Sequence, residues 1–167
     1  MPKLLVLFQS SDSDVVRLAA AAAEGARSVR FAEVDLRQLP GPDDAAGTAS
    51  AATGRTHHRL EHVDAIGQYD GVVLAIGQNG EGVQRALDGL GGALANKVGS
   101  AVTPARGDER RTVLWSVLTP MADRGMILVP APFTDESAGS DEPVRALGKR
   151  VAEVIGWVTH ARSHRHH

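Results

Sequence analysis

The sequence predicts an α/β fold, a three-layer sandwich in which parallel strands alternate with helices. Residues 4–8 and 71–76 are short, continuous apolar runs, as expected of strands buried on both faces of a sheet. Elsewhere, apolar residues recur at helical spacing, most clearly at Leu147, Val151 and Ile155. The change from strand-like to helix-like spacing repeats along the chain, and this repetition predicts the fold class.

Five strands and four helices are expected in alternation. The strands are predicted at 4–8, 29–36, 71–76, 98–103 and 126–129. The helices are predicted at 14–27, 83–94, 109–124 and 144–161. Pro120 is expected to kink or break the third helix. Right-handed crossovers between parallel strands then favour a five-stranded sheet of order 2-1-3-4-5.

Length and composition indicate one domain. The chain has 167 residues, of which 43% are hydrophobic, enough for a substantial core. We assign residues 1–161 to this domain and 162–167 to a flexible, histidine-containing tail. Residues 40–54, rich in Gly, Ala, Asp, Ser and Thr, are expected to form a surface loop.

Charge and cysteine content exclude several classes of function. The formal net charge of −2 gives no reason to expect a nucleic-acid partner. The absence of cysteine excludes disulfides and thiolate chemistry. The apolar run near the N-terminus is too short to span a membrane and lacks a cleavage signal. We therefore expect a cytoplasmic protein without a membrane partner.

The predicted strand order places a ligand beyond the carboxyl ends of the first and third strands. Three loops reach that position. Their residues are Ser10, Ser11, Asp12, Ser13 and Asp14; Gly77, Gln78, Asn79 and Gly80; and Thr103, Pro104, Ala105, Arg106 and Gly107.

The first loop combines features that point in opposite directions. It precedes a predicted helix, and the amides at such a helix start favour a phosphate. Asp12 and Asp14, however, bring negative charge to this position. A unit pair of like charges about 5 Å apart costs roughly 3 kcal/mol at an effective dielectric constant near 20. Alternatively, Asp12, Ser13 or Asp14 simply caps the helix, or the carboxylates turn outward into water.

Several stretches of the chain resemble the WrbA family of flavodoxin-like NAD(P)H:quinone oxidoreductases. They follow the family's order and cover most of the chain. The matching residues are 3–8 with Ser10, 18–19, 23–26, 32–34, 69–71, 85–88, 91–92, 96–97 and 124–130. The resemblance implies a flavodoxin-like fold, with FMN held by the same three loops.

The departures from the family pattern fall on those loops. Asp12 and Asp14 stand where neutral or imidazole-type residues are usual, and Ser13 stands where the family has glycine. The second loop, 77–81, lacks several residues and an aromatic side chain, and the third has lost its Ser-Thr-Gly-rich run. The segment 132–142, which helps to build the family's tetramer, is short here.

Two functions follow from these departures. The leading hypothesis is a divergent member of the family that has lost tight FMN binding and acts as a non-catalytic binding or structural partner. The three loops would then be remnants of the FMN site, with no cofactor. The alternative is an FMN-dependent enzyme that reduces quinones by two electrons with NAD(P)H. Neither hypothesis assigns a catalytic residue.

Other candidate residues carry weaker signals. Arg106 offers a cation to an anionic ligand, but isolated surface arginines are common, and Asn79-Gly80 is also a plain turn signal. Two histidine clusters are candidates for a metal. The spacing of His58 and His62 could bind a divalent metal on a helix, and the second cluster could capture a metal adventitiously, yet solvated histidines are more common, so we predict no metal site. The clusters are His57, His58 and His62, and His160, His164, His166 and His167.

The chain is expected to form a homo-oligomer. Trp157 lies beside the apolar stripe of the last helix rather than at its centre, and could be left for a partner. Because segment 132–142 is short, we expect a dimer rather than the family's tetramer.

Overall fold

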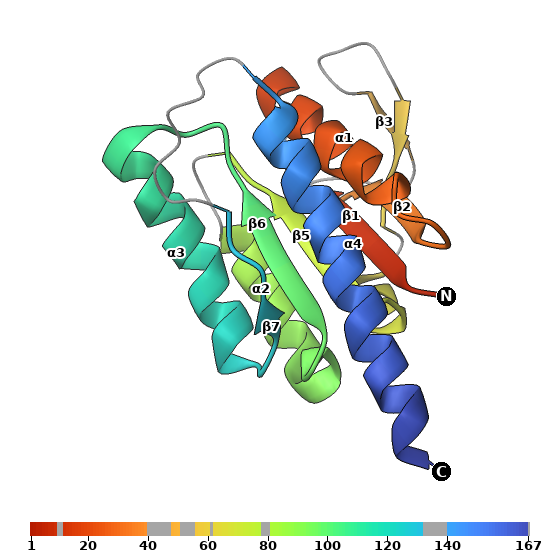
Figure 1. Cartoon of the computed structure of the whole chain (residues 1–167). Helices are drawn as coiled ribbons and strands as arrows, with labels where there is room; N and C mark the ends of the chain where they lie inside the picture. Colours follow the sequence, from red (N-terminus) through yellow and green to blue (C-terminus); the bar gives the residue numbers. More distant parts are fainter. Residues whose placement is uncertain are drawn as a thin grey trace.

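The computed structural model describes most of the chain. The described residues are 1–9, 12–39, 48–50, 56–60, 62–77, 81–131 and 140–166. They form a central sheet with helices on both sides (Figure 1).

The central sheet has five parallel strands in the order β2-β1-β5-β6-β7, which confirms the predicted order 2-1-3-4-5. The strands are β1 (Lys3–Phe8), β2 (Glu33–Gln38), β5 (Gly71–Ala75), β6 (Val98–Val102) and β7 (Ile127–Leu128). β1, β5 and β6 are buried almost throughout, whereas the edge strands β2 and β7 are partly exposed. Continuous apolar runs therefore mark the centre of the sheet, as expected for strands covered on both faces.

Four helices cover the sheet. They are α1 (Ser13–Arg27), α2 (Glu81–Leu90), α3 (Gly107–Asp123) and α4 (Glu142–Ser163). α1 and α4 lie on one face, and α2 and α3 lie on the other (Figure 1). Short 3₁₀ segments complete the chain: η1 (Val63–Gln68), η2 (Gly91–Leu94) and η3 (His164–His166).

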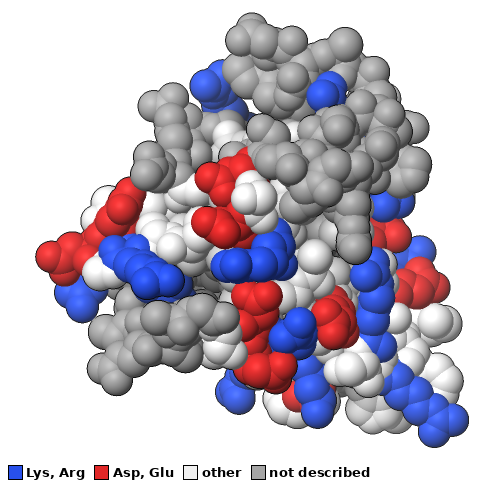
Figure 2. Space-filling model, turned by 90° about the horizontal axis from the view of Figure 1, so that it is seen from above, with Lys and Arg blue, Asp and Glu red and all other residues white. Residues whose placement is uncertain are grey.

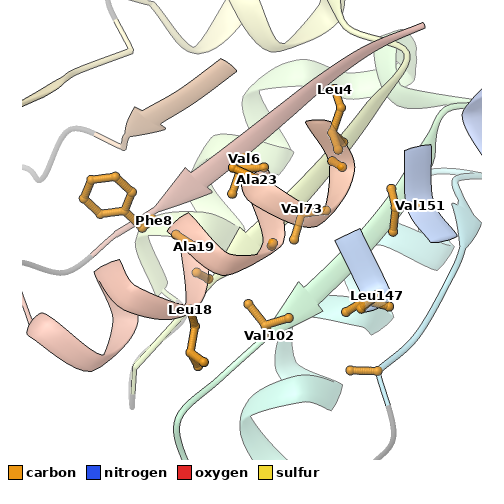
Figure 3. Close-up of a cluster of buried hydrophobic side chains, with 14 of the residues drawn as sticks. Leu4, Val6, Phe8, Leu18, Ala19, Ala23, Val73, Val102, Leu147 and Val151 are labelled. Carbon is orange, nitrogen blue, oxygen red and sulfur yellow. The ribbon is translucent and has the colours of Figure 1, made fainter. Parts of the chain in front are cut away.

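Alternate side chains of β1 supply the two halves of the core. Leu4, Val6 and Phe8 point to α1 and α4, in the cluster drawn in Figure 3. Leu5 and Leu7 point to the opposite face and pack in the second cluster, with residues of α2 and α3. The side-chain period of two in a strand explains why a continuous apolar run fills both layers.

α1 and α4 approach each other at two glycines. A Cβ atom on Gly25 would lie 1.9 Å from the carbonyl oxygen of Arg145, and one on Gly148 would lie 2.0 Å from that of Ala22. No side chain fits at such separations, so these glycines allow the two backbones to touch. This contact holds α4 against α1 rather than only against the sheet.

Several predicted boundaries were wrong. β2 begins at Glu33 rather than at residue 29, because the chain turns before it, with Phe31 at a φ of 69°. Part of the predicted loop 40–54 is a strand: β3 (Thr48–Ser50) pairs antiparallel with β4 (Thr56–His58). The rest of that loop lies outside the described residues.

The third and fourth predicted helices also differ in detail. Pro120 does not break α3, which continues to Asp123. Proline lacks the N–H that would bond the carbonyl of Ser116, so α3 loses one hydrogen bond close to its end and still continues. α4 continues to Ser163 and is followed by η3, so the predicted tail 162–167 begins inside a helix. Within the described part of the chain, no helix has both the length and the apolar character needed to cross a membrane.

Candidate functional site

The three predicted loops leave the sheet at one edge. Phe8 is in register with Ala75, and Ala75 is in register with Val102, so the loops that follow these residues start side by side. α1 and α3 also begin at this end (Figure 1). Figure 2 looks onto it and shows acidic and basic side chains interspersed among the described residues, without a patch of one sign. The topology therefore assembles the predicted site.

Asp12 caps the first helix. Its Oδ1 accepts a hydrogen bond from the backbone N–H of Asp14 at 2.8 Å, and its side chain is exposed. Aspartate is among the preferred residues at this position because its oxygen satisfies an amide that the helix leaves open. The exposed carboxylate thus occupies one of the amides that a phosphate would use.

Asp14 faces solvent and a positive partner. Its Oδ1 lies 3.7 Å from Nη1 of Arg17, and 60% of its side chain is accessible. Nε of Arg17 also lies 3.4 Å from Oδ1 of Asp141, one residue before α4. Arg17 therefore offsets part of the negative charge that the sequence places at this end of α1.

Thr103 connects the second and third loops. Its Oγ1 donates to the carbonyl oxygen of Gly77 at 3.3 Å and accepts from the backbone N–H of Ala105 at 3.2 Å. The side chain is buried, directly after β6. This hydroxyl fixes the ends of β5 and β6 relative to each other.

Arg110 is a site residue that the sequence analysis missed. Its side chain is buried, and Nη1 donates to the carbonyl oxygen of Thr103 at 3.1 Å. Arg106, the predicted cation, is exposed instead. Helical spacing could have indicated that Arg110 is buried, because it lies on the stripe of α3 that also carries Val113, Leu114 and Val117.

At the start of α3, no side chain caps the helix and the space around Gly107 is open. Gly107 has a φ of 61°, and no described atom lies within 4 Å of the position that a Cβ would take. Arg106 stands at the cap position before α3, and among the described residues its side chain makes no capping hydrogen bond to the first amides of the helix. Pro104 and Ala105 are half-buried beside this turn.

Of the other predicted site residues, five lie outside the described part of the chain: Ser10, Ser11, Gln78, Asn79 and Gly80.

The structure separates the first histidine cluster but brings two histidines of the second close together. His57 and His58 lie on β4 and His62 precedes η1, so these residues do not share the helix that their spacing required. By contrast, His160 and His164 lie one turn apart, with their Nε2 atoms 3.1 Å from each other. Within the described residues, no group of three or more potential ligands could hold a metal ion.

Comparisons with known proteins identify relatives of this chain. It is 33% identical over 147 residues to an NAD(P)H dehydrogenase (quinone) of Acidithiobacillus ferrooxidans, covering 80% of this chain and 73% of that protein. A protein of the same name from Azorhizobium caulinodans is 34% identical over 150 residues, covering 81% and 74%. No family model matches the chain. The chain belongs to the WrbA-type family of flavodoxin-like NAD(P)H:quinone oxidoreductases.

Solved structures confirm the flavodoxin-like fold of this WrbA-type chain. A flavodoxin, WrbA-like protein from Agrobacterium tumefaciens superposes with a TM-score of 0.63 at 19% identity, covering 94% of this chain and 99% of that one. A short-chain flavodoxin associated with a bacterial microcompartment gives a TM-score of 0.64 at 10% identity, covering 93% and 99%. At these identities the likeness concerns the fold alone.

Proposed function

We propose that this protein is an FMN-dependent NAD(P)H:quinone oxidoreductase, the alternative in the sequence analysis. The proposal rests on its identity of 33–34% to proteins named NAD(P)H dehydrogenase (quinone) over four fifths of the chain. Loss of FMN binding, the leading hypothesis from sequence, was based on Asp12 and Asp14, on the shortened second loop and on the altered third loop. The part that concerns the aspartates required them to face inward. Asp12 and Asp14 are both exposed, so the charge penalty is smaller than that hypothesis required.

The described residues fit a flavin mononucleotide. The start of α3 offers backbone without a side-chain cap, at Gly107, and space that a Cβ would otherwise fill. At α1, the exposed carboxylate of Asp12 can leave its amide at the cost of one helix cap, about 1 kcal/mol. Ser13 and the amides at the start of α1 would hold the phosphate. Gly77 and the loop from Thr103 to Gly107 would hold the ring.

The chain's own contribution is position and rigidity. The Thr103 hydroxyl ties the two ring-side loops together, and the buried guanidinium of Arg110 holds the Thr103 carbonyl. Loop ends that are held in place before binding lose less conformational freedom when the cofactor binds. When bound, FMN would supply the redox chemistry, accepting hydride from NAD(P)H and passing two electrons to a quinone.

One observation favours the competing function of a non-catalytic partner. The Asp12 carboxylate already satisfies the Asp14 amide, as a bound phosphate would. If this cap is strong enough to exclude FMN, the fold would serve only as a binding or structural module.

A flavin titration separates the two functions. Purified protein, stripped of flavin by dialysis against high salt, is titrated with FMN while the quenching of flavin fluorescence is followed. We expect saturable one-to-one binding at about micromolar concentration or tighter, near −8 kcal/mol. We also expect NAD(P)H oxidation with a quinone only after FMN is added. Absence of saturation at high micromolar FMN would favour the non-catalytic partner.

A further inference from the structure

Two histidines near the C-terminal end of α4 face each other. His160 and His164 are four residues apart and exposed, and their Nε2 atoms lie 3.1 Å apart. Their rings meet edge to face, with centroids 4.4 Å apart. Residues at i and i+4 share one helix face, so the backbone itself holds the two nitrogens together.

The separation of the two nitrogens suits one metal ion. With metal–nitrogen bonds of about 2.0 Å, the two ligand nitrogens lie about 2.8 Å apart at a right angle and about 3.3 Å apart at a tetrahedral angle. The observed 3.1 Å falls between these values. In the structure the two atoms share a hydrogen bond, in which one Nε2 carries the hydrogen. An ion would take the place of this hydrogen, with each ring carrying its hydrogen on Nδ1, and only a small movement of either side chain would be needed.

Within a single chain, the surroundings leave this pair open to an ion. The nearby Arg162 donates from Nη2 to the carbonyl oxygen of Asn96, which holds its guanidinium toward the start of β6. Trp157, 65% exposed, lies three residues before His160 on the same outward face. The pair is also remote from the proposed flavin loops, because α4 starts at their end of the molecule and ends at the other (Figure 1).

We propose that His160 and His164 form a surface site for a divalent transition-metal ion, and that Cu²⁺, Ni²⁺ and Zn²⁺ can each bind there. Imidazole suits these ions, whereas Mg²⁺ and Ca²⁺ prefer oxygen. The two Nε2 atoms bind the ion as neutral imidazoles, and water fills the remaining positions. The site is independent of the proposed quinone reductase activity.

Calorimetric titration of the flavin-free full chain with each ion tests the site. We expect one equivalent of Cu²⁺ to bind more tightly than Ni²⁺ or Zn²⁺, following the usual order of divalent affinities, and Mg²⁺ not to bind. His160→Ala and His164→Ala should each weaken Cu²⁺ binding at least about tenfold, because one ligand of a two-ligand site is lost. In a Trp115→Phe background, Cu²⁺ should quench the fluorescence of Trp157, and His160→Ala should remove that quenching at the same ion concentration.

Two matched variants locate the ligands. His62→Ala, an exposed histidine on another segment, should bind as the wild type does. His166→Ala with His167→Ala should retain most of the affinity. The proposal is overturned if this tail variant abolishes binding, if His160→Ala and His164→Ala bind normally, or if the wild type binds none of the three ions.

Discussion

At the scale of single residues, the orientation of two carboxylates changes the functional conclusion. The sequence places Asp12 and Asp14 at the start of α1, and an inward orientation would repel a phosphate strongly. In the structure Asp12 caps the helix and Asp14 pairs with Arg17, both at the surface. In water-like surroundings a unit pair of charges costs only about 1 kcal/mol at 4 Å, against several in a drier site.

The charge of Asp12 should still lower the affinity for FMN relative to that for riboflavin. Asp12→Asn keeps a good helix cap but removes the charge. We expect about tenfold tighter FMN binding, since phosphate carries about −1.5 to −2 charges, and unchanged binding of riboflavin, which lacks the phosphate. Fluorescence-quenching titrations with both flavins measure the ratio. Asp123→Asn, exposed at the far end of α3, is the control, and an equal gain for both flavins would contradict a charge effect.

At the scale of elements, the contact between α1 and α4 depends on glycine. We expect Gly148→Ala to lower the free energy of unfolding by about 2 kcal/mol or more, because its Cβ would lie 2.0 Å from the Ala22 carbonyl and the helices must separate. Gly156→Ala is a control in the same helix, since no described atom lies within 4 Å of its Cβ. This change should stabilise by about 0.5–1 kcal/mol, because alanine favours helix. Urea unfolding of both variants measures the difference, and equal effects would show that the close contact is not maintained in solution.

A second prediction concerns the contact between β2 and the turn before β5. Tyr69 Oη donates to Oδ2 of Asp35 at 2.6 Å. Partial burial, and then the bond to and charge of Asp35, raise the pKa of Tyr69 from 10.0 to about 12. A raised pKa in the folded state means that this contribution to stability is complete below about pH 10 and is lost as the pH rises toward about 12.

The prediction can be measured directly, because Tyr69 is the chain's one tyrosine. Its ultraviolet phenolate absorbance should titrate near pH 12 in the folded protein and near 10 in denaturant. Asp35→Asn should lower the folded pKa, since only the effect of burial and a neutral hydrogen bond would remain. A normal pKa in the folded protein would show that the Tyr69–Asp35 contact does not persist in solution.

At the scale of the whole molecule, the oligomeric state stays a prediction, as does location in the cytoplasm. Trp157 is 65% exposed on the outer face of α4, as expected if a partner is to cover it. We expect a dimer by light scattering coupled to size exclusion. Trp157→Ser should shift the protein toward monomer, whereas Trp115→Ser on α3 should not. A tetramer would show that the family's longer segment after the last strand is not needed.

The sequence alone was sufficient for the architecture. Continuous apolar runs marked the central strands, and helical spacing marked the layers around them, because both signals are local and repeat over many residues. The position of the ligand loops followed, since parallel strands end at the same edge of a sheet. Boundaries were less well determined: Phe31 turns the chain before β2, and β3 pairs with β4 within a segment without a clear periodic pattern.

Tertiary structure determined what the site residues do. The orientation of Asp12, the burial of Arg110 against Thr103 and the pairing of Arg17 with Asp141 depend on contacts between separate elements. So does the length of α4, whose last turns carry the Arg162 bond to Asn96 and the meeting of His160 and His164. Residue types and spacing list the groups available for chemistry. Only packing sets which atoms face each other and which face water, and charge and metal binding depend on that arrangement.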